Sequence, residues 1–341
     1  MKTRQNNFGG PQPNVKVVEI SDPTTAGEDI EVIEQNLVQL RSDPLRARRV
    51  VVRLESTVLL YHSTNLAVRT RTTMKPGMIG VVAFGPRAKG KVNGLIVHPN
   101  LMLMAAEGTK CQFVVEADYE SIVVGISPTD FEAHLRARHL RDPLQRQSVV
   151  DLLVCNAKKA CEFFSFGKRL ADIAAQKPEL FDGKKDVCAA AEVELIEMLL
   201  EAIGSLEDYA VTPFDQRHQA YSQLVQVAEE YALTHTGGPL YVTDLCKAAA
   251  VSERTLQYAF KEILGMSPVA FLQRLRLHRV RQALRAATRG TTTVSAEALK
   301  WGFWHFGEFS LAYKKCFGEL PSDTLRRGPD LPRRVRERKS L

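Results

Sequence analysis

The stretch that decides the fold occurs twice, as "YAFKEILGMSP" at 258–268 and as "LAYKKCFGELP" at 311–321. A shift of 53 residues places alanine on alanine, aromatic on aromatic, glycine on glycine and proline on proline. The matched pairs are Ala259/Ala312, Phe260/Tyr313, Lys261/Lys314, Leu264/Phe317, Gly265/Gly318 and Pro268/Pro321. A repeat of this kind predicts one structural unit that the chain uses twice.

Each copy extends backwards into a second short helix. In the first copy we expect a helix from the N-cap Thr243 to about Ala249, a tight turn, and a helix from the N-cap Ser252 to Leu264. Gly265 would end that helix. The second copy has the same plan, but the spacing between copies changes from 52 to 53 across the turn, so its turn is one residue longer. Two short helices joined by such a turn form a helix-turn-helix.

A basic helix is predicted between the two copies, in "SPVAFLQRLRLHRVRQAL" at 267–284. Pro268 suits its first position. Its core-facing residues would be Phe271, Leu272, Leu275, Val280 and Leu284. The remaining face is crowded by Arg274, Arg276, Arg279, Arg281 and Arg285. This helix would fix the distance between the units, and successive major grooves on one face of DNA lie ~34 Å apart.

The charge of the chain is divided unevenly. Residues 1–210 carry 26 basic and 27 acidic side chains, whereas residues 211–341 carry 20 and 12. The basic excess in the last third favours a polyanionic partner for that part, although a solvated basic surface would give the same count. The segment "RRVRERKS" at 333–340 is read as a basic tail that adds non-specific affinity for DNA.

The composition suits a two-domain cytoplasmic protein. The chain has 341 residues, no run of eighteen apolar residues, and an N-terminus that lacks the apolar core of a signal peptide. Its six cysteines form no C-x-x-C pair, so we expect reduced thiols, no structural zinc site and no cofactor.

The front of the chain reads as strands followed by helices. Residues 50–127 contain short Val/Ile/Leu-rich runs and a tight-turn signal at Asn93-Gly94, which predicts a small antiparallel barrel or sandwich. From Ser127 to about 206 the pattern is mainly helical. One helix there has an apolar stripe that could pack on the barrel or pair with its twin in a second subunit. The stripe consists of Ile196, Leu199, Leu200 and Ile203.

Residues 216–327 resemble the DNA-binding domain of the AraC/XylS family of transcription regulators. The residues that carry the resemblance are Leu256, Phe260, Lys261, Gly265, Arg276-Leu277, Gly302-Phe303, Phe309, Lys314-Lys315, Gly318 and Pro321. The strand-rich front and "VNG" at 92–94 are similar to that family's effector-binding and dimerisation domain. The fold class so implied is α+β, with a strand-rich, barrel-like domain and appended helices at 1–210, an all-α domain with two tandem helix-turn-helix units at 211–327, and a basic tail at 328–341.

The resemblance also implies DNA-contacting residues, because in the family the second helix of each unit enters the major groove. The base-facing places are held by Arg254, Gln257 and Tyr258, and in the second unit by His305, Gly307, Glu308 and Leu311. Candidates for phosphate contacts are Ser252, Lys261, Arg274, Ser295 and Lys314. Leu311 replaces a usual polar residue and Trp304 a usual capping residue, so we expect the second helix chiefly to hold the phosphate backbone.

From this resemblance we expect the protein to be a sequence-specific transcription regulator. The simplest form is an activator controlled by a small molecule or a partner. Promoter DNA, RNA polymerase and a second copy of the chain are its expected partners, and repression stays open. Two alternatives remain: the front domain serves only dimerisation or protein interaction, or it is an enzyme fused to a DNA-binding module. Only His62 and His98 fall among the strands, and no catalytic or metal-binding constellation stands out.

Overall fold

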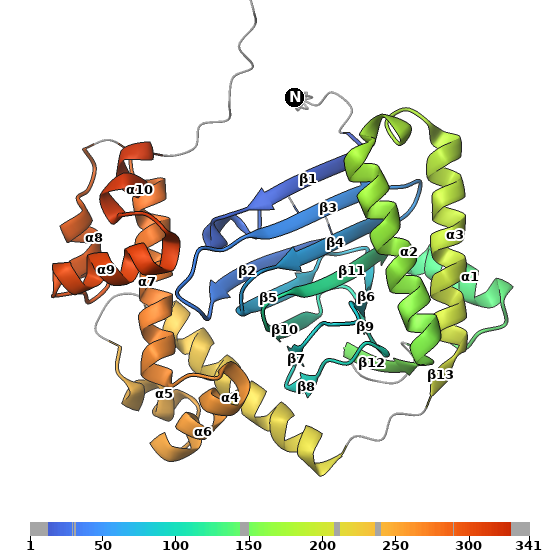
Figure 1. The fold of residues 1–341 in the computed structure, drawn as a ribbon. Helices are drawn as coiled ribbons and strands as arrows, with labels where there is room; N and C mark the ends of the chain where they lie inside the picture. The colour runs from blue at the N-terminus through green and yellow to red at the C-terminus, as the bar shows by residue number, and fades with distance from the viewer. Residues whose placement is uncertain are drawn as a thin grey trace, which may run out of the picture.

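The computed structural model describes residues 13–28, 30, 32–143, 150–207, 212–235, 240–288 and 290–328. Strands come first and helices last, as the α+β prediction requires (Figure 1). The basic tail after Gly328, including 333–340, lies outside the described residues.

Two antiparallel sheets form the front of the molecule. The larger sheet has the order β1 (Val15–Ile20), β3 (Ala47–Arg53), β4 (Val58–Thr64), β11 (Tyr119–Ile126), β6 (Ile79–Phe84), β9 (Leu101–Ala105), β12 (Val150–Cys155) and β13 (Leu206–Glu207). The smaller sheet has the order β2 (Ile33–Gln39), β5 (Val68–Met74), β10 (Lys110–Val115), β7 (Gly90–Val92) and β8 (Leu95–Ile96). The sheets face each other across a shared core without closing, so of the predicted barrel or sandwich the structure has the sandwich.

The larger sheet is buried on both faces because its strands carry continuous apolar runs, whose successive side chains point to opposite faces. In β3, Val51 belongs to the core between the two sheets, whereas Val50 and Val52 belong to a second core on the other face. That second core is covered by the helices that follow the strands. They are α1 (Pro128–Ala137), α2 (Ala157–Gln176) and α3 (Lys185–Gly204).

The Asn93-Gly94 turn is a tight hairpin, as predicted. Asn93 has a φ of +49° and Gly94 a φ of +89°, the left-handed pair that a two-residue hairpin needs. A Cβ on Gly94 would lie 2.3 Å from the backbone oxygen of His218. The hairpin therefore presses against the helix that opens the second half of the chain, and only glycine allows this approach.

Several strands of the structure were not predicted from the sequence. No strand was predicted for β1 or β2, which precede residue 50, and β12 lies inside the stretch expected to be mainly helical. The run at Val150–Cys155 is short and apolar, so its period distinguishes neither a helix nor a strand. Pairing with β9 on one side and β13 on the other decides the conformation.

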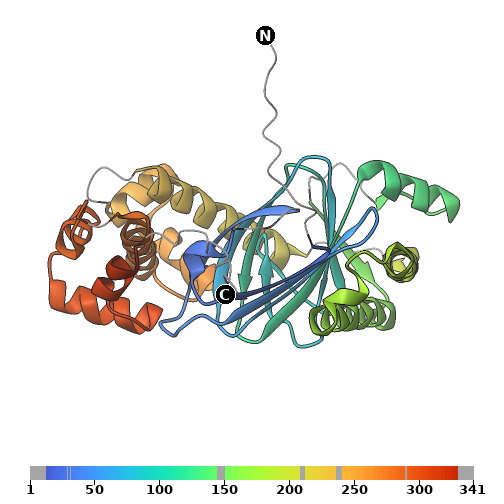
Figure 2. The same ribbon diagram turned by 90° about the horizontal axis from the view of Figure 1, so that it is seen from above.

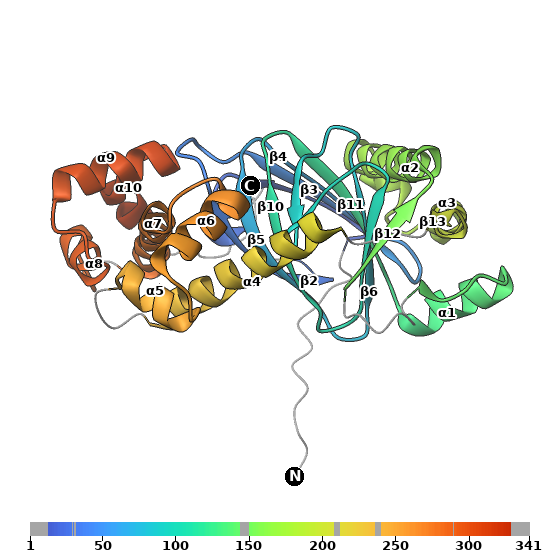
Figure 3. The same ribbon diagram turned by 90° about the horizontal axis from the view of Figure 1, so that it is seen from below.

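The second half of the chain is helical. Its first helix is α4 (Pro213–Thr234), held by a capping box between Thr212 and Asp215. The others are α5 (Val242–Ala248), α6 (Glu253–Leu264), α7 (Pro268–Ala286), α8 (Val294–Lys300), α9 (Phe306–Phe317) and α10 (Pro321–Arg327). They gather on one side of the sheets, with α2 and α3 on the opposite side (Figures 1 and 2). Figure 3 shows α4 running from below the sheets to α5.

Among the described residues, no helix has the length and apolarity needed to span a bilayer.

Candidate nucleic-acid interface

Two helix-turn-helix units are present, and they differ in their turns as predicted. Four residues, 249–252, connect α5 to α6, whereas five residues, 301–305, connect α8 to α9. Each turn passes through the left-handed region at the same repeat position, at Ala250 with φ +52° and at Gly302 with φ +80°. The extra residue follows this shared point, which is where the repeat spacing changes from 52 to 53.

The helix ends explain why the repeated glycines are needed. Gly265 and Gly318 adopt φ values of +69° and +77°, and they end α6 and α9 in the left-handed conformation. At the start of α6, the Ser252 hydroxyl accepts a hydrogen bond from the Thr255 N–H at 3.2 Å, which confirms the predicted N-cap. The predicted N-cap Thr243 is wrong by two residues, because the N-cap of α5 is Tyr241.

Each unit has its own small core, and α7 contributes to both. Leu256 and Phe260 are fully buried in the first core, and Tyr313 is fully buried in the second. The first half of α7 packs in the core of the first unit, and its second half packs in the core of the second unit. All five apolar residues predicted for this helix, Phe271, Leu272, Leu275, Val280 and Leu284, are buried.

The exposed face of α6 brings the first set of predicted base-facing residues together. Arg254, Gln257 and Tyr258 are all exposed and line one shallow hollow together with Lys261. The Arg254 guanidinium lies 5.6 Å from the Tyr258 ring centroid, and the Gln257 amide donates to Glu253 at 3.0 Å. These contacts occupy little of the donor capacity of either side chain, so both can bond to another surface.

The corresponding surface of the second unit combines polar and apolar side chains. His305, Gly307 and Glu308 are exposed, and the apolar side chains of Leu311 and Trp304 are 72% and 75% exposed. The residue at the N-cap position is His305, one beyond Trp304, and its side chain makes no capping hydrogen bond. The second unit therefore offers a different surface chemistry on the same scaffold.

The five candidates for phosphate contacts separate into two groups. Ser252, Lys261, Ser295 and Lys314 are exposed on the two units. Arg274 is half-buried instead, and it donates to the Ser42 hydroxyl of the front domain and to Cys316 Sγ, the latter at 3.4 Å. In this structure Arg274 thus serves the contact between the two halves of the chain.

The other arginines of α7 explain this arrangement. Arg281 lies 2.8 Å from Asp22 and 3.0 Å from Glu319, and Arg285 lies 2.7 Å from the same Asp22. Burial opposes ionisation of Asp22, yet Arg281, Thr24 and Arg285 together hold its pKa below the usual value. The sequence showed that α7 has a basic face, but not that its last turns face the front domain.

The α3 stripe predicted for a subunit contact is buried within the chain. Ile196, Leu199, Leu200 and Ile203 are each at most 3% exposed and belong to the core shared with α2 and the larger sheet. This is packing on the sheet, the alternative that the sequence left open. Exposed apolar residues on these helices are Ile173, Val187 and Val193.

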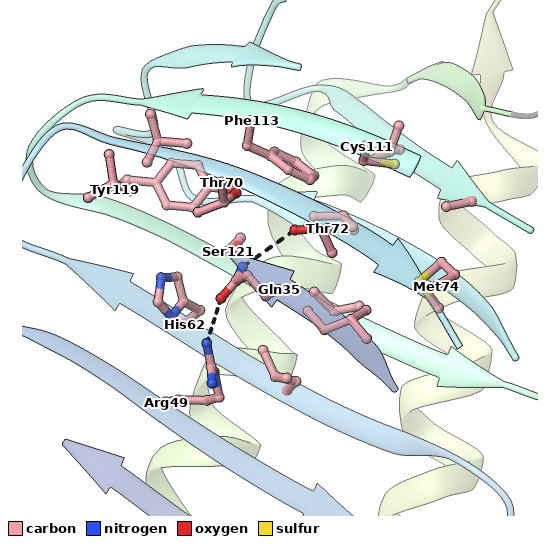
Figure 4. A pocket seen from close by; sticks show the side chains of 18 residues that line it. Gln35, Arg49, His62, Thr70, Thr72, Met74, Cys111, Phe113, Tyr119 and Ser121 are labelled. Atoms are coloured by element: carbon pink, nitrogen blue, oxygen red, sulfur yellow. Dashed lines mark hydrogen bonds between the residues drawn. The ribbon is translucent and has the colours of Figure 1, made fainter. Parts of the chain in front are cut away.

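A cavity lies between the two sheets, at a site for which the sequence suggested no residues (Figure 4). Its wall includes the buried polar side chains Arg49 and His62, and half-buried Gln35. The pair Arg48-Arg49 could have indicated this cavity from the sequence. Successive side chains of a strand point to opposite faces, so one of two adjacent arginines must point inward. Within the described ranges, no three His, Cys, Asp or Glu side chains are grouped so that they could hold a metal.

Comparisons with known proteins agree with this geometry. A family described as "Helix-turn-helix domain" matches residues 245–327. The chain is 32% identical over 127 residues to a probable thc operon regulatory protein of Rhodococcus erythropolis, which covers 37% of this chain and 38% of that protein. It is 31% identical over 127 residues to XylDLEGF operon transcriptional activator 2 of Pseudomonas putida, covering 37% of this chain and 77% of the relative.

A solved structure, a probable AraC family transcriptional regulator from Rhodopseudomonas palustris, is 37% identical and has a TM-score of 0.29, covering 31% of this chain and 98% of that one. For the Rhodococcus protein the match thus spans under two fifths of its length, whereas it spans most of the shorter Pseudomonas activator. The tandem units and this sequence similarity lead to one conclusion: the chain belongs to the AraC/XylS family of transcription regulators.

Proposed function

We propose that the protein is a sequence-specific transcription regulator that binds promoter DNA through both helix-turn-helix units. The observation that carries this proposal is the exposed α6 face, where Arg254 and Gln257 lie three residues apart on one side of the helix. Arginine can bond guanine and glutamine can bond adenine through paired hydrogen bonds in the major groove. Lys261 on the same helix and Lys314 on α9 of the second unit are exposed and would hold phosphates.

The second unit would read bases by a different chemistry. Leu311 occupies a base-facing place and is 72% exposed, which suits contact with the methyl group of thymine. Glu308, one turn earlier, can accept a hydrogen bond from the amino group of cytosine. This assignment gives α9 a role in base reading beyond the phosphate contacts expected from the sequence.

The front domain would control DNA binding through the strand that joins the cavity to the helices. Gln35 of β2 lines the cavity, and Gln39 at the end of the same strand meets the second half of the chain. The Gln39 N–H donates to His278 Nε2 at 3.4 Å, and its side chain donates to the Cys316 carbonyl at 3.2 Å. A small molecule that shifts β2 would therefore change how α7 and α9 are held.

Asp22 offers a second connection between the same parts. The Arg49 guanidinium in the cavity wall donates to the Ala26 carbonyl at 2.9 Å, four residues after Asp22. Asp22 in turn pairs with Arg281 and Arg285 of α7. An effector bound beside Arg49 would act on both connections, the one through Gln39 and the one through Asp22. The result would be a changed affinity of the protein for DNA or for RNA polymerase.

We further propose that the protein acts in the cytoplasm as a homodimer. The outer sides of α2 and α3 carry exposed Ile173 and Val193, whereas the predicted stripe is buried. Val193→Glu should lower the mass measured in solution from dimer to monomer while the far-UV circular dichroism stays unchanged. A dimer that survives this change would exclude this face as the contact.

The test of DNA binding is a selection of duplexes from a random pool by the full chain, followed by titration at several salt concentrations. A preferred site should emerge, and the logarithm of its binding constant should fall linearly with the logarithm of salt concentration, with a slope of about −0.9 per phosphate contacted. If no sequence is enriched over the starting pool, the proposed function is wrong.

A further inference from the structure

Arg49, which has no acidic partner among the described residues, is buried in the wall of the cavity between the sheets (Figure 4). Arg49 is 2% exposed, and its two Nη atoms donate to the Ala26 carbonyl and to Gln35 Oε1 at 2.9 and 2.8 Å. Its Nε has no hydrogen-bond partner among the described residues. Burial lowers the pKa of Arg49 to about 10, which still leaves it protonated at neutral pH. A buried cation with only neutral partners is costly.

A second unpartnered polar atom lies beside this cation. His62 is the cross-strand partner of Arg49, and its Nδ1 also has no partner within the described part of the chain. Burial, followed by the nearby Arg49 charge, lowers the pKa of His62 to about 3. The ring is therefore neutral, and one of its nitrogens carries a hydrogen. Two polar side chains, each more than nine-tenths buried, thus have unused hydrogen-bonding capacity at this cavity.

The rest of the cavity limits the size and character of what could bind there. Most of the wall is apolar, with Leu60, Val82 and Leu103 among its residues. The volume is about 60 Å³, and one water molecule takes ~10–15 Å³ on the same scale, so about four to six non-hydrogen atoms fit. Gln35 and Phe113 are half-buried, and the other lining residues are buried.

We propose that this cavity binds a short-chain carboxylate, with the carboxylate group on Arg49 and His62 and the carbon chain against the apolar wall. The negative charge would compensate the guanidinium, and the two oxygens would accept hydrogen bonds from Arg49 Nε–H and from His62 in its Nδ1–H tautomer. A neutral molecule of the same shape could fill the volume but would leave the cation uncompensated. The inference rests on the proposed effector role of the front domain and names the ligand class for it.

The test is calorimetric titration of the full chain, without DNA, using propionate and its neutral isostere propionamide. A charge-assisted pair at a buried site should make propionate bind about tenfold or more tightly than the amide. Nitrate and hexanoate extend the comparison, and both should bind more weakly than propionate. Equal binding of acid and amide, or no propionate binding, overturns the proposal. Tighter binding of nitrate overturns the carboxylate class, and tighter binding of hexanoate overturns the size limit.

Variants identify the site. Arg49→Met should abolish propionate binding, whereas Arg48→Met should keep it, because Arg48 is the adjacent strand residue and pairs instead with Glu19 and Asp172. Ala105→Val would narrow the cavity and should weaken binding if Arg49→Met does not fold. Retained binding in a folded Arg49→Met variant places the ligand elsewhere and overturns the site. Operator titration with and without propionate is a separate measurement, so loss of the ligand proposal leaves DNA binding intact.

Discussion

Single side chains on α6 and α9 decide what the two units can read. In the first unit, Arg254 and Gln257 are exposed and carry several donors, while Lys261 lies on the same surface with a single mobile charge. In the second unit, Leu311 occupies a base-facing position, and its side chain has no hydrogen-bonding group. The two units therefore share a backbone plan and differ in the chemistry of a few exposed atoms.

The first prediction separates base reading from phosphate contact. Arg254→Ala or Gln257→Ala should cost ~1–3 kcal/mol on the selected operator and relax the choice of one base pair. Lys261→Ala should weaken operator and scrambled duplex about equally and reduce the salt slope by about one unit. Fluorescence titrations of both duplexes at two salt concentrations measure this. Equal loss on both duplexes in the Arg254 and Gln257 variants would show that these residues do not read bases.

The second prediction concerns Leu311 and thymine. Replacing thymine by deoxyuridine removes only the methyl group, so the substitution should weaken wild-type binding at one or two positions of the second half-site. Burial of a methyl group contributes ~0.8 kcal/mol, which is about a fourfold change in affinity. Leu311→Ala should lose this sensitivity. A titration in which both proteins respond equally to deoxyuridine would contradict the contact.

At the scale of elements, α7 has two roles that its sequence combines. Its apolar residues complete both small cores, and its arginines bind Asp22 and Glu319. His278 lies on the same helix, 4% exposed, and accepts a hydrogen bond from the Gln39 N–H. The helix is therefore fixed to the front domain by both charged and neutral contacts.

The third prediction follows from His278 and concerns pH. Burial lowers its folded pKa to about 3, although Asp22 raises it and Arg274 and Arg281 lower it further. The unfolded chain has a histidine pKa near about 6.5. Between about pH 6.5 and pH 3 the unfolded chain therefore binds a proton at His278 that the folded chain does not, so the free energy of unfolding falls as the pH falls. The loss should be about 1.4 kcal/mol per pH unit for each such histidine. Urea unfolding between pH 6 and 4.5 should show it.

The controls for this prediction are two substitutions. His278→Gln keeps a hydrogen-bond acceptor and should reduce the pH slope by about 1.4 kcal/mol per unit. His98→Gln changes an exposed histidine and should leave the slope as in the wild type. A His278→Gln variant with an unchanged slope would show that this histidine does not contribute to the loss of stability in acid.

On the scale of the whole molecule, the two halves share a buried ion pair. Arg69 of β5 lies 3.2 Å from Glu229 of α4, and both side chains are 1% exposed. Leu40 of the front domain is also buried in the core of the first unit. Separating the halves would hydrate both charges, so the pair fixes their relative position more than it stabilises the chain.

The fourth prediction tests this pair. Glu229→Gln leaves Arg69 buried without a counter-ion and should destabilise the full chain by about 3–5 kcal/mol. The double variant Arg69→Met, Glu229→Leu removes both charges and should recover most of that loss. In the fragment 211–341, which we expect to fold alone, Glu229→Gln should have little effect because the position is hydrated. A similar cost of Glu229→Gln in full chain and fragment would show that Arg69 is not its cause.

The sequence by itself determined the helical part of the fold. The repeat, the Gly–Pro ends and the changed spacing are local features, and they identified both helix-turn-helix units, the longer second turn and the apolar face of α7. The Asn93-Gly94 hairpin was predictable for the same reason, because its backbone angles depend on the two residues themselves.

Only the tertiary structure decided which surface each face meets. A periodic pattern shows that the α3 stripe is apolar, but it does not distinguish a sheet of the same chain from a second subunit. Likewise the arginines of α7 were recognisable as a charged face, while their pairing with Asp22, some 260 positions earlier, depends on how the halves dock. The cavity around Arg49 also arises from strands distant in sequence. Such contacts are set by packing between elements, which local propensity does not encode.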